Sequence, residues 1–97
     1  MKLRFTPQAT QDLIDIADHI RASNPQAAER VRGAILETLQ ILVSFPNMGR
    51  RQNVEGVRKL VTRRYGYLVY YRVEEEQAEI AVLAIRHPAR ARPAQDL

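Results

Sequence analysis

The change of hydrophobic period between residues 46 and 57 constrains the fold of this chain more than any other feature. Before it, apolar side chains recur every three or four positions, whereas after it they alternate with polar ones. The first spacing is typical of amphipathic helices and the second of strands with one buried face. A short alternating run at residues 2–5 precedes the helical part. The sequence therefore predicts one short strand, a helical region and then a sheet-forming region.

Two helices are expected to begin at a capping residue followed by proline, namely at Thr6-Pro7 and at Asn24-Pro25. In each pair the first residue is a favourable N-cap, and the proline takes the first helical position, where its missing N–H costs nothing. The first helix is expected to end near Ala22. The second is expected over residues 24–45, because Pro46 cannot continue it.

The apolar stripes of these helices are expected to face the sheet. They consist of Leu13, Ile16, Ala17 and Ile20 in the first helix, and of Val31, Ile35, Thr38, Leu39, Leu42 and Phe45 in the second. Asp12, Asp15 and His19 fall on the opposite side of the first helix, where an ion pair between Asp15 and His19 would account for the histidine. Since the connection between the helices is short, they should fold back as an antiparallel hairpin.

Three more strands are expected after a polar loop at residues 47–56. They cover residues 57–62, 67–73 and 79–87 and are separated by the turns RRYG and EEEQA. The run from Ile80 to Ile85 is apolar on both faces, which places it inside the sheet with both faces covered. Alternation divides the preceding strand into one face with Tyr67, Val69 and Tyr71 and another with Leu68, Tyr70 and Arg72.

The resulting order of elements is β-α-α-β-β-β. The simplest architecture for it is an α+β fold, in which a helical hairpin packs on one face of a small, mainly antiparallel sheet. A chain of 97 residues supports one modest core, so residues 1–97 are expected to form a single domain. Residues 88–97 contain two prolines and no apolar periodicity, and we expect them to form a mobile tail.

Composition excludes several classes of function. The chain has no cysteine, so neither a disulfide framework nor a thiolate metal site is available. No segment resembles a signal peptide, and no run reaches the roughly 18 apolar residues of a membrane span. No cluster of metal ligands and no glycine-rich phosphate loop is visible. We therefore expect a cytoplasmic protein that has no membrane contact, no metal and no cofactor.

Positive charge is concentrated in one segment. Residues 1–49 carry as many Lys and Arg as Asp and Glu, whereas residues 50–72 carry seven Lys or Arg against Glu55 alone. Tyrosines are interleaved with these cations, and this composition is typical of surfaces that stack on bases and neutralise phosphates. The segment thus indicates a polyanionic partner, either a nucleic acid or an acidic protein surface, or else a basic face that serves solubility only.

His87 is the residue with the clearest potential for acid–base chemistry. It ends the last expected strand between Arg86 and Pro88, close to Arg90. A histidine beside arginines can move protons during RNA cleavage, because its ordinary pKa lies near neutrality. A structural role, in which the imidazole caps the strand or bonds a carbonyl, is an equally good interpretation.

Several local patterns, in this order along the chain, resemble the RelE/ParE superfamily, the toxins of type II toxin-antitoxin modules that are often labelled plasmid stabilisation proteins. They are RFTPQATQDLIDI, NPQAAERV, FPNMGR, GVRKL, YYRV and RHPAR. The resemblance covers essentially the whole chain. It implies a toxin that is neutralised by a cognate antitoxin, for which an exposed sheet edge would offer a binding site.

The resemblance leaves two toxic mechanisms and one inactive alternative. ParE-like members trap the cleaved complex of DNA gyrase, and Arg58, Arg64, Arg86 and Arg90 would then contact the target. RelE-like members cut mRNA on the ribosome, and His87, Arg58, Arg64, Arg86 and Glu55 would then be the catalytic set. Pro88 stands where the ribonuclease branch has a tyrosine, which favours the ParE-like, non-enzymatic interpretation. An inactive homologue that only binds antitoxin is the third possibility.

Overall fold

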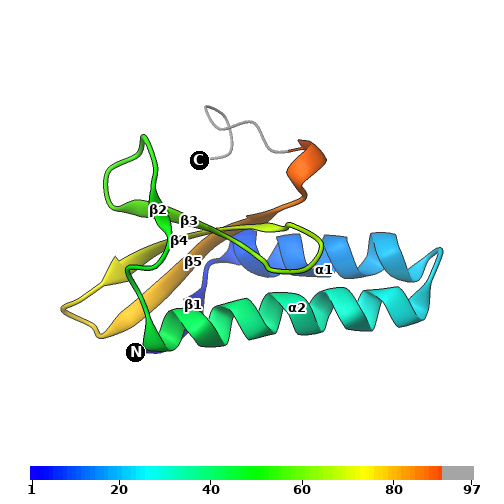
Figure 1. Ribbon diagram of the computed structural model, residues 1–97, viewed down its shortest axis with the longest axis horizontal. Helices are drawn as coiled ribbons and strands as arrows, with labels where there is room; N and C mark the ends of the chain where they lie inside the picture. The colour runs from blue at the N-terminus through cyan, green and yellow to red at the C-terminus, as the bar shows by residue number, and fades with distance from the viewer. Residues whose placement is uncertain (91–97) are drawn as a thin grey trace.

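The computed structural model describes residues 1–90 as a helical hairpin packed on a five-stranded sheet (Figure 1). The elements are β1 (Lys2–Phe5), α1 (Pro7–Arg21), α2 (Pro25–Ser44), β2 (Arg50–Arg51), β3 (Val57–Val61), β4 (Leu68–Glu74), β5 (Glu79–Arg86) and the short 3-10 helix η1 (Pro88–Arg90). The α+β class and the element order are as predicted. The two-residue strand β2 is an addition, because its residues were expected to belong to a loop.

The sheet has the strand order β1-β5-β4-β3-β2. Strand β1 pairs with β5 in parallel, and the other three pairs are antiparallel. The long apolar strand β5 therefore lies inside the sheet, as its composition predicted. Because β1 and β2 form the two edges, each offers unpaired backbone groups on its outer side. Neither helix within residues 1–90 is long and apolar enough to cross a membrane.

Both helices begin where proline and a capping residue predicted. The Thr6 hydroxyl accepts a hydrogen bond from the N–H of Ala9 at 3.1 Å and donates one to the carbonyl of Leu83 at 3.0 Å. The start of α1 is thereby attached to β5. The side chain of Asn24 accepts from the N–H of Ala27 at 3.1 Å and caps α2 in the same way.

The main core lies between the helices and the sheet. Ile35, Leu39 and Leu42 of α2 pack there against Val69 and Tyr71 of β4, together with Ile80, Val82 and Ile85 of β5. A smaller cluster of Val57, Tyr70 and Ala84 lies on the other face of the sheet. The predicted division of the β4 tyrosines between the two faces is thus confirmed. The register shifts between Tyr70 and Tyr71, where Leu83 has no partner on β4.

Two side chains lie on the wrong side of the predicted helix stripes. Phe45 was expected in the core, but it follows the last turn of α2 as its C-cap and is 64% exposed. Asp12 was expected in solvent, but only 6% of its surface is exposed. The helical period shows which side chains share one face of a helix. It shows neither the residue at which the helix ends, which decides the position of Phe45, nor the distance of the sheet from the helix, which decides the burial of Asp12.

Candidate functional site

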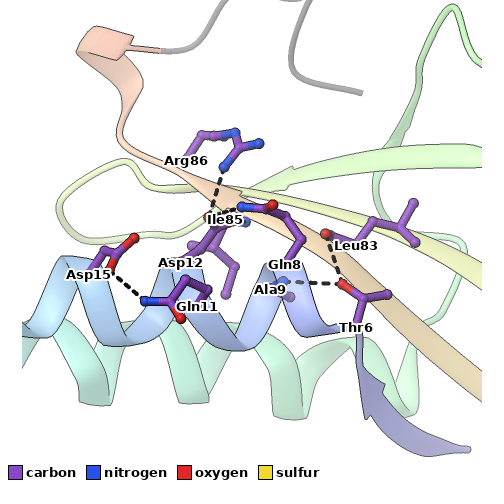
Figure 2. Close-up of polar contacts among 9 residues, drawn as sticks. All are labelled: Thr6, Gln8, Ala9, Gln11, Asp12, Asp15, Leu83, Ile85 and Arg86. Atoms are coloured by element: carbon purple, nitrogen blue, oxygen red, sulfur yellow. Dashed lines mark hydrogen bonds and ion pairs between the residues drawn. The ribbon is translucent and has the colours of Figure 1, made fainter.

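Asp12 joins α1 to the end of β5 (Figure 2). One of its carboxylate oxygens, Oδ2, accepts the backbone N–H of Ile85 at 2.9 Å, and the other, Oδ1, accepts Nη1 of Arg86 at 2.9 Å. Gln8 donates to that second oxygen at 2.7 Å from one turn earlier in the helix. Three hydrogen-bond donors of the protein thus satisfy this buried carboxylate. Arg86 was predicted to contact a target, but it is held by this internal ion pair.

Sequence reasoning missed Asp12, although a signal was present. The residue is three positions after the buried Ala9 and four before Ile16, so it shares their face of α1. Its acidic character outweighed that spacing in the prediction. The expected pair of Asp15 with His19 is also wrong, because Asp15 instead accepts a hydrogen bond from Gln11 at 2.8 Å.

His87 lies beside this ion pair, at the end of β5. Its ring makes an edge-to-face contact with Tyr67, with centroids 5.4 Å apart and an interplanar angle of 88°. Its Nδ1 accepts the N–H of Ala89 at 3.1 Å, which attaches η1 to the strand. The imidazole and Tyr67 line a cleft of about 210 Å³ together with Asp12, Asp15 and Arg86. His87 thus has a structural partner on one nitrogen and an open cleft beside its ring.

Arg58 holds the loop that follows α2. Its Nη1 donates to the carbonyl of Asn47 at 3.1 Å and to that of Gly49 at 2.8 Å. The Tyr71 hydroxyl completes this anchor, since it donates to the carbonyl of Pro46 at 2.8 Å and accepts the N–H of Gly49 at 2.8 Å. Burial raises the pKa of Tyr71, while the Gly49 hydrogen bond and the charge of Arg58 oppose the shift. The half-buried Arg58 is therefore partly committed to the fold.

The residues proposed for RNA cleavage lie in two groups. Arg58 is paired with Tyr71 and Arg86 with Leu68, so about 10 Å along β4 and two strand spacings of about 4.8 Å separate the two arginines. Glu55 lies beyond Arg58, in a pocket of about 510 Å³ that also contains Val57 and Val73. Neither Glu55 nor Arg58 lines the cleft beside His87. The structure thus brings Arg86 to His87 but leaves Glu55 and Arg58 apart from them.

The remaining candidate, Arg64, lies in the turn between β3 and β4. It and Arg63 line a pocket of about 180 Å³ against Glu37 and Thr38 of α2. The side chain of Arg90 lies outside the described part of the structure.

A cationic row crosses the face of the sheet that the helices leave open. Arg50 is opposite Lys59, and Lys59 is opposite Tyr70, so the three residues share one face. Arg72 is two positions along β4 from Tyr70 and points to the same side. Among the described residues, none of the seven Lys and Arg between positions 50 and 72 forms an ion pair. Their charge is therefore available to a partner.

A metal-dependent mechanism has no ligand set in the part of the chain that the structure covers. Across residues 1–90, no three His, Asp or Glu side chains gather closely enough to hold a metal ion.

Comparisons with known proteins agree with the fold. A family model described as the ParE toxin of the type II toxin-antitoxin system, parDE, matches residues 3–92. A solved structure of the chromosomal ParDE system from P. aeruginosa superposes with a TM-score of 0.77 at 32% identity, covering 90% of this chain and 95% of that one.

The chain is also similar to two further proteins. A toxin candidate of Sinorhizobium fredii, Y4kP, is 28% identical over 86 residues, which are 89% of this chain and 86% of that protein. The isolated E. coli RelE toxin shares the fold, with a TM-score of 0.63 at 17% identity, covering 93% of this chain and 86% of that one. On the family match over residues 3–92, the chain belongs to the ParE toxins of type II toxin-antitoxin systems.

Proposed function

We propose that this protein is a ParE-like toxin that binds DNA gyrase, stabilises its cleaved complex with DNA and is neutralised by a cognate antitoxin. The observation that carries the proposal is the separation of the acid–base candidates on the sheet. Cleavage of RNA needs a base, an acid and cations around one phosphate. Here Arg86, which precedes His87, is paired with Leu68 at the start of β4, whereas Arg58 is paired with Tyr71 in the middle of β4 and shares a different pocket with Glu55. The family match and the ParDE neighbour support the same conclusion.

Target binding is assigned to cations that form no ion pair within residues 1–90. Arg50, Lys59 and Arg72 on the open face, with Arg64 in the neighbouring turn, form no ion pairs among the described residues. Such side chains steer association with a negatively charged complex, of which cleaved DNA on gyrase is an example. Arg58 adds positive charge while its bonds to the preceding loop fix its position. The action takes place in the cytoplasm, where gyrase works.

Antitoxin binding is proposed for the helical hairpin and the free edge of β1. An apolar groove of about 540 Å³ runs between α1 and α2, and Ile14 and Leu36 on its rim are 47% and 37% exposed. An amphipathic helix fits such a groove, and an extended segment can add to a strand edge. The P. aeruginosa neighbour was solved as a ParDE system, which supports a partner of this kind.

The cleft beside His87 is the one observation that favours an mRNA endonuclease instead. Two assays on the purified chain separate the mechanisms. We expect inhibition of gyrase supercoiling with accumulation of cleaved DNA, and intact mRNA on programmed ribosomes. Cut mRNA together with unaffected gyrase would replace the proposal with the ribonuclease mechanism. Inactivity in both assays, with tight antitoxin binding, would leave an inactive homologue.

A further inference from the structure

The turn between β3 and β4 is a clamped hairpin tip. Residues 62–67 form it, and its centre is the buried side chain of Thr62, which is 3% exposed. The Thr62 hydroxyl donates to the carbonyl of Arg64 at 2.5 Å and accepts the N–H of Tyr67 at 3.0 Å. The N–H of Thr62 donates to the carbonyl of Tyr67 at 2.9 Å. These three hydrogen bonds, two of them made by the Thr62 hydroxyl, join both ends of the tip and close the turn.

Tyr65 is in an unfavourable backbone conformation at this tip. Its φ is 67°, in the left-handed region that a bulky side chain rarely adopts, and Gly66 follows with φ 66°. The ring is 47% exposed, and its hydroxyl has no hydrogen-bond partner among the described residues. No hydrogen bond of the side chain therefore accounts for a tyrosine where glycine or asparagine would suit the backbone better. A strained residue that the fold does not require points to a function outside the fold.

Two arginines, Arg63 and Arg64, directly precede Tyr65 in the turn. Arg63 and Arg64 are exposed and take part in no ion pair within the described chain. Both residues line the small pocket beside α2, where Glu37 is the one opposing charge among the lining residues. The tip therefore presents an exposed aromatic ring with an excess of positive charge.

We propose that the tip of residues 62–67 binds an unpaired nucleic-acid strand, with a base stacked on Tyr65 and neighbouring phosphates contacted by Arg63 and Arg64. Stacking on an aromatic ring beside arginines is the general mode of single-strand binding. Lys59 and Arg72 of the same hairpin add further positive charge on the open face of the sheet, with Arg72 about 13 Å along β4 from Leu68 at the tip.

An acidic protein surface fits these observations less well. Arginines alone satisfy carboxylates, and they give no reason to keep a large ring in the left-handed region. Direct contact between this tip and an unpaired strand is expected whether gyrase or the ribosome is the toxin's target.

The test measures binding of the purified full-length chain to a fluorescent 15-nucleotide DNA strand of mixed sequence, by anisotropy over a range of salt concentrations. Tyr65→Asn removes the ring but suits the backbone, so we expect binding about 5- to 150-fold weaker. The same variant should melt at an unchanged temperature or up to about 4 °C higher, because strain is relieved. Tyr65→Phe keeps the ring and should bind within about twofold of the wild type.

Charge is tested with a matched pair of double variants. Arg63→Gln/Arg64→Gln should lower the slope of log affinity against log salt by about 1.4, since each phosphate contact on a single strand contributes about 0.7. Arg30→Gln/Arg32→Gln on exposed positions of α2 removes the same charge and should leave the slope nearly unchanged. Equal slopes in the two double variants, or undiminished binding by Tyr65→Asn, would overturn the proposal. So would poly-glutamate that displaces the strand as well as unlabelled DNA does, which would point to an acidic protein partner.

Discussion

Replacing Asp12 by asparagine should destabilise the protein severely, although the two side chains have almost the same shape. The carboxylate accepts three hydrogen bonds, from Ile85 N–H, Arg86 and Gln8, and is nearly fully buried. An amide has one oxygen to offer. If that oxygen stays with Arg86 and Gln8, the amide NH₂ faces the N–H of Ile85, and two donors oppose each other.

The magnitude follows from what is lost. A hydrogen bond to a charged group contributes about 1.5–3 kcal/mol, and a buried donor left without an acceptor costs about 1–3 kcal/mol. Allowing for partial relaxation, we expect Asp12→Asn to lower the free energy of unfolding by about 3 kcal/mol. For a domain of this size, that corresponds to a fall in Tm of roughly 12–24 °C.

Urea unfolding followed by circular dichroism measures this directly, with the m-value as a check on two-state behaviour. Asp15→Asn is the matched control, because it changes the same group one turn away on an exposed surface, and it should alter stability by less than about 0.5 kcal/mol. A loss below about 1 kcal/mol for Asp12→Asn, with an unchanged m-value, would refute the role given to this carboxylate.

The anchor of the loop after α2 gives two further predictions. A Cβ at Gly49 would lie 2.6 Å from the Tyr71 hydroxyl and 2.9 Å from the Lys59 carbonyl, so Gly49→Ala should destabilise by about 1–3 kcal/mol; Gly33→Ala, on an open position of α2, should instead stabilise by about 0.5–1 kcal/mol in the same urea titration. The raised pKa of Tyr71 means that folding favours its neutral form. The contribution of the neutral hydroxyl to the free energy of unfolding is therefore fully present below about pH 10, the ordinary pKa of tyrosine, and is lost as the pH rises through the folded-state pKa. The stability advantage of the wild type over Tyr71→Phe should therefore shrink as the pH is raised above about 10, and a constant advantage would contradict the assignment.

Local signals predicted most of the fold. Thr6 and Asn24 cap their helices through bonds to residues three positions ahead, so a few letters of sequence contain the whole interaction. Alternation in β4 divided its tyrosines correctly because one face of that strand meets the helices. Strand β2 was missed because two residues carry no period, and Arg50 and Arg51 become a strand only by pairing with residues of β3.

The candidate site was less predictable for the same reason. The role of Asp12 depends on an N–H and a guanidinium more than 70 residues away, and no local pattern reports such a contact. Arg58 was predicted to bind a target from its charge, yet part of its guanidinium holds two carbonyls of the preceding loop. Charge in a sequence identifies residues that can bind a partner, while the fold determines which of them are already engaged.

The central claim is that this toxin acts by binding gyrase and performs no proton transfer of its own. The most direct test compares wild type with His87→Gln in a gyrase assay that quantifies cleaved plasmid DNA after denaturation of the enzyme. A glutamine oxygen can still accept the N–H of Ala89, so η1 should stay attached and antitoxin binding should remain normal. We expect cleaved DNA with both proteins, in amounts that differ by less than about threefold. Loss of toxicity in His87→Gln by the roughly 100-fold or more expected for a general acid or base, with wild-type protein cutting ribosome-bound mRNA, would contradict it.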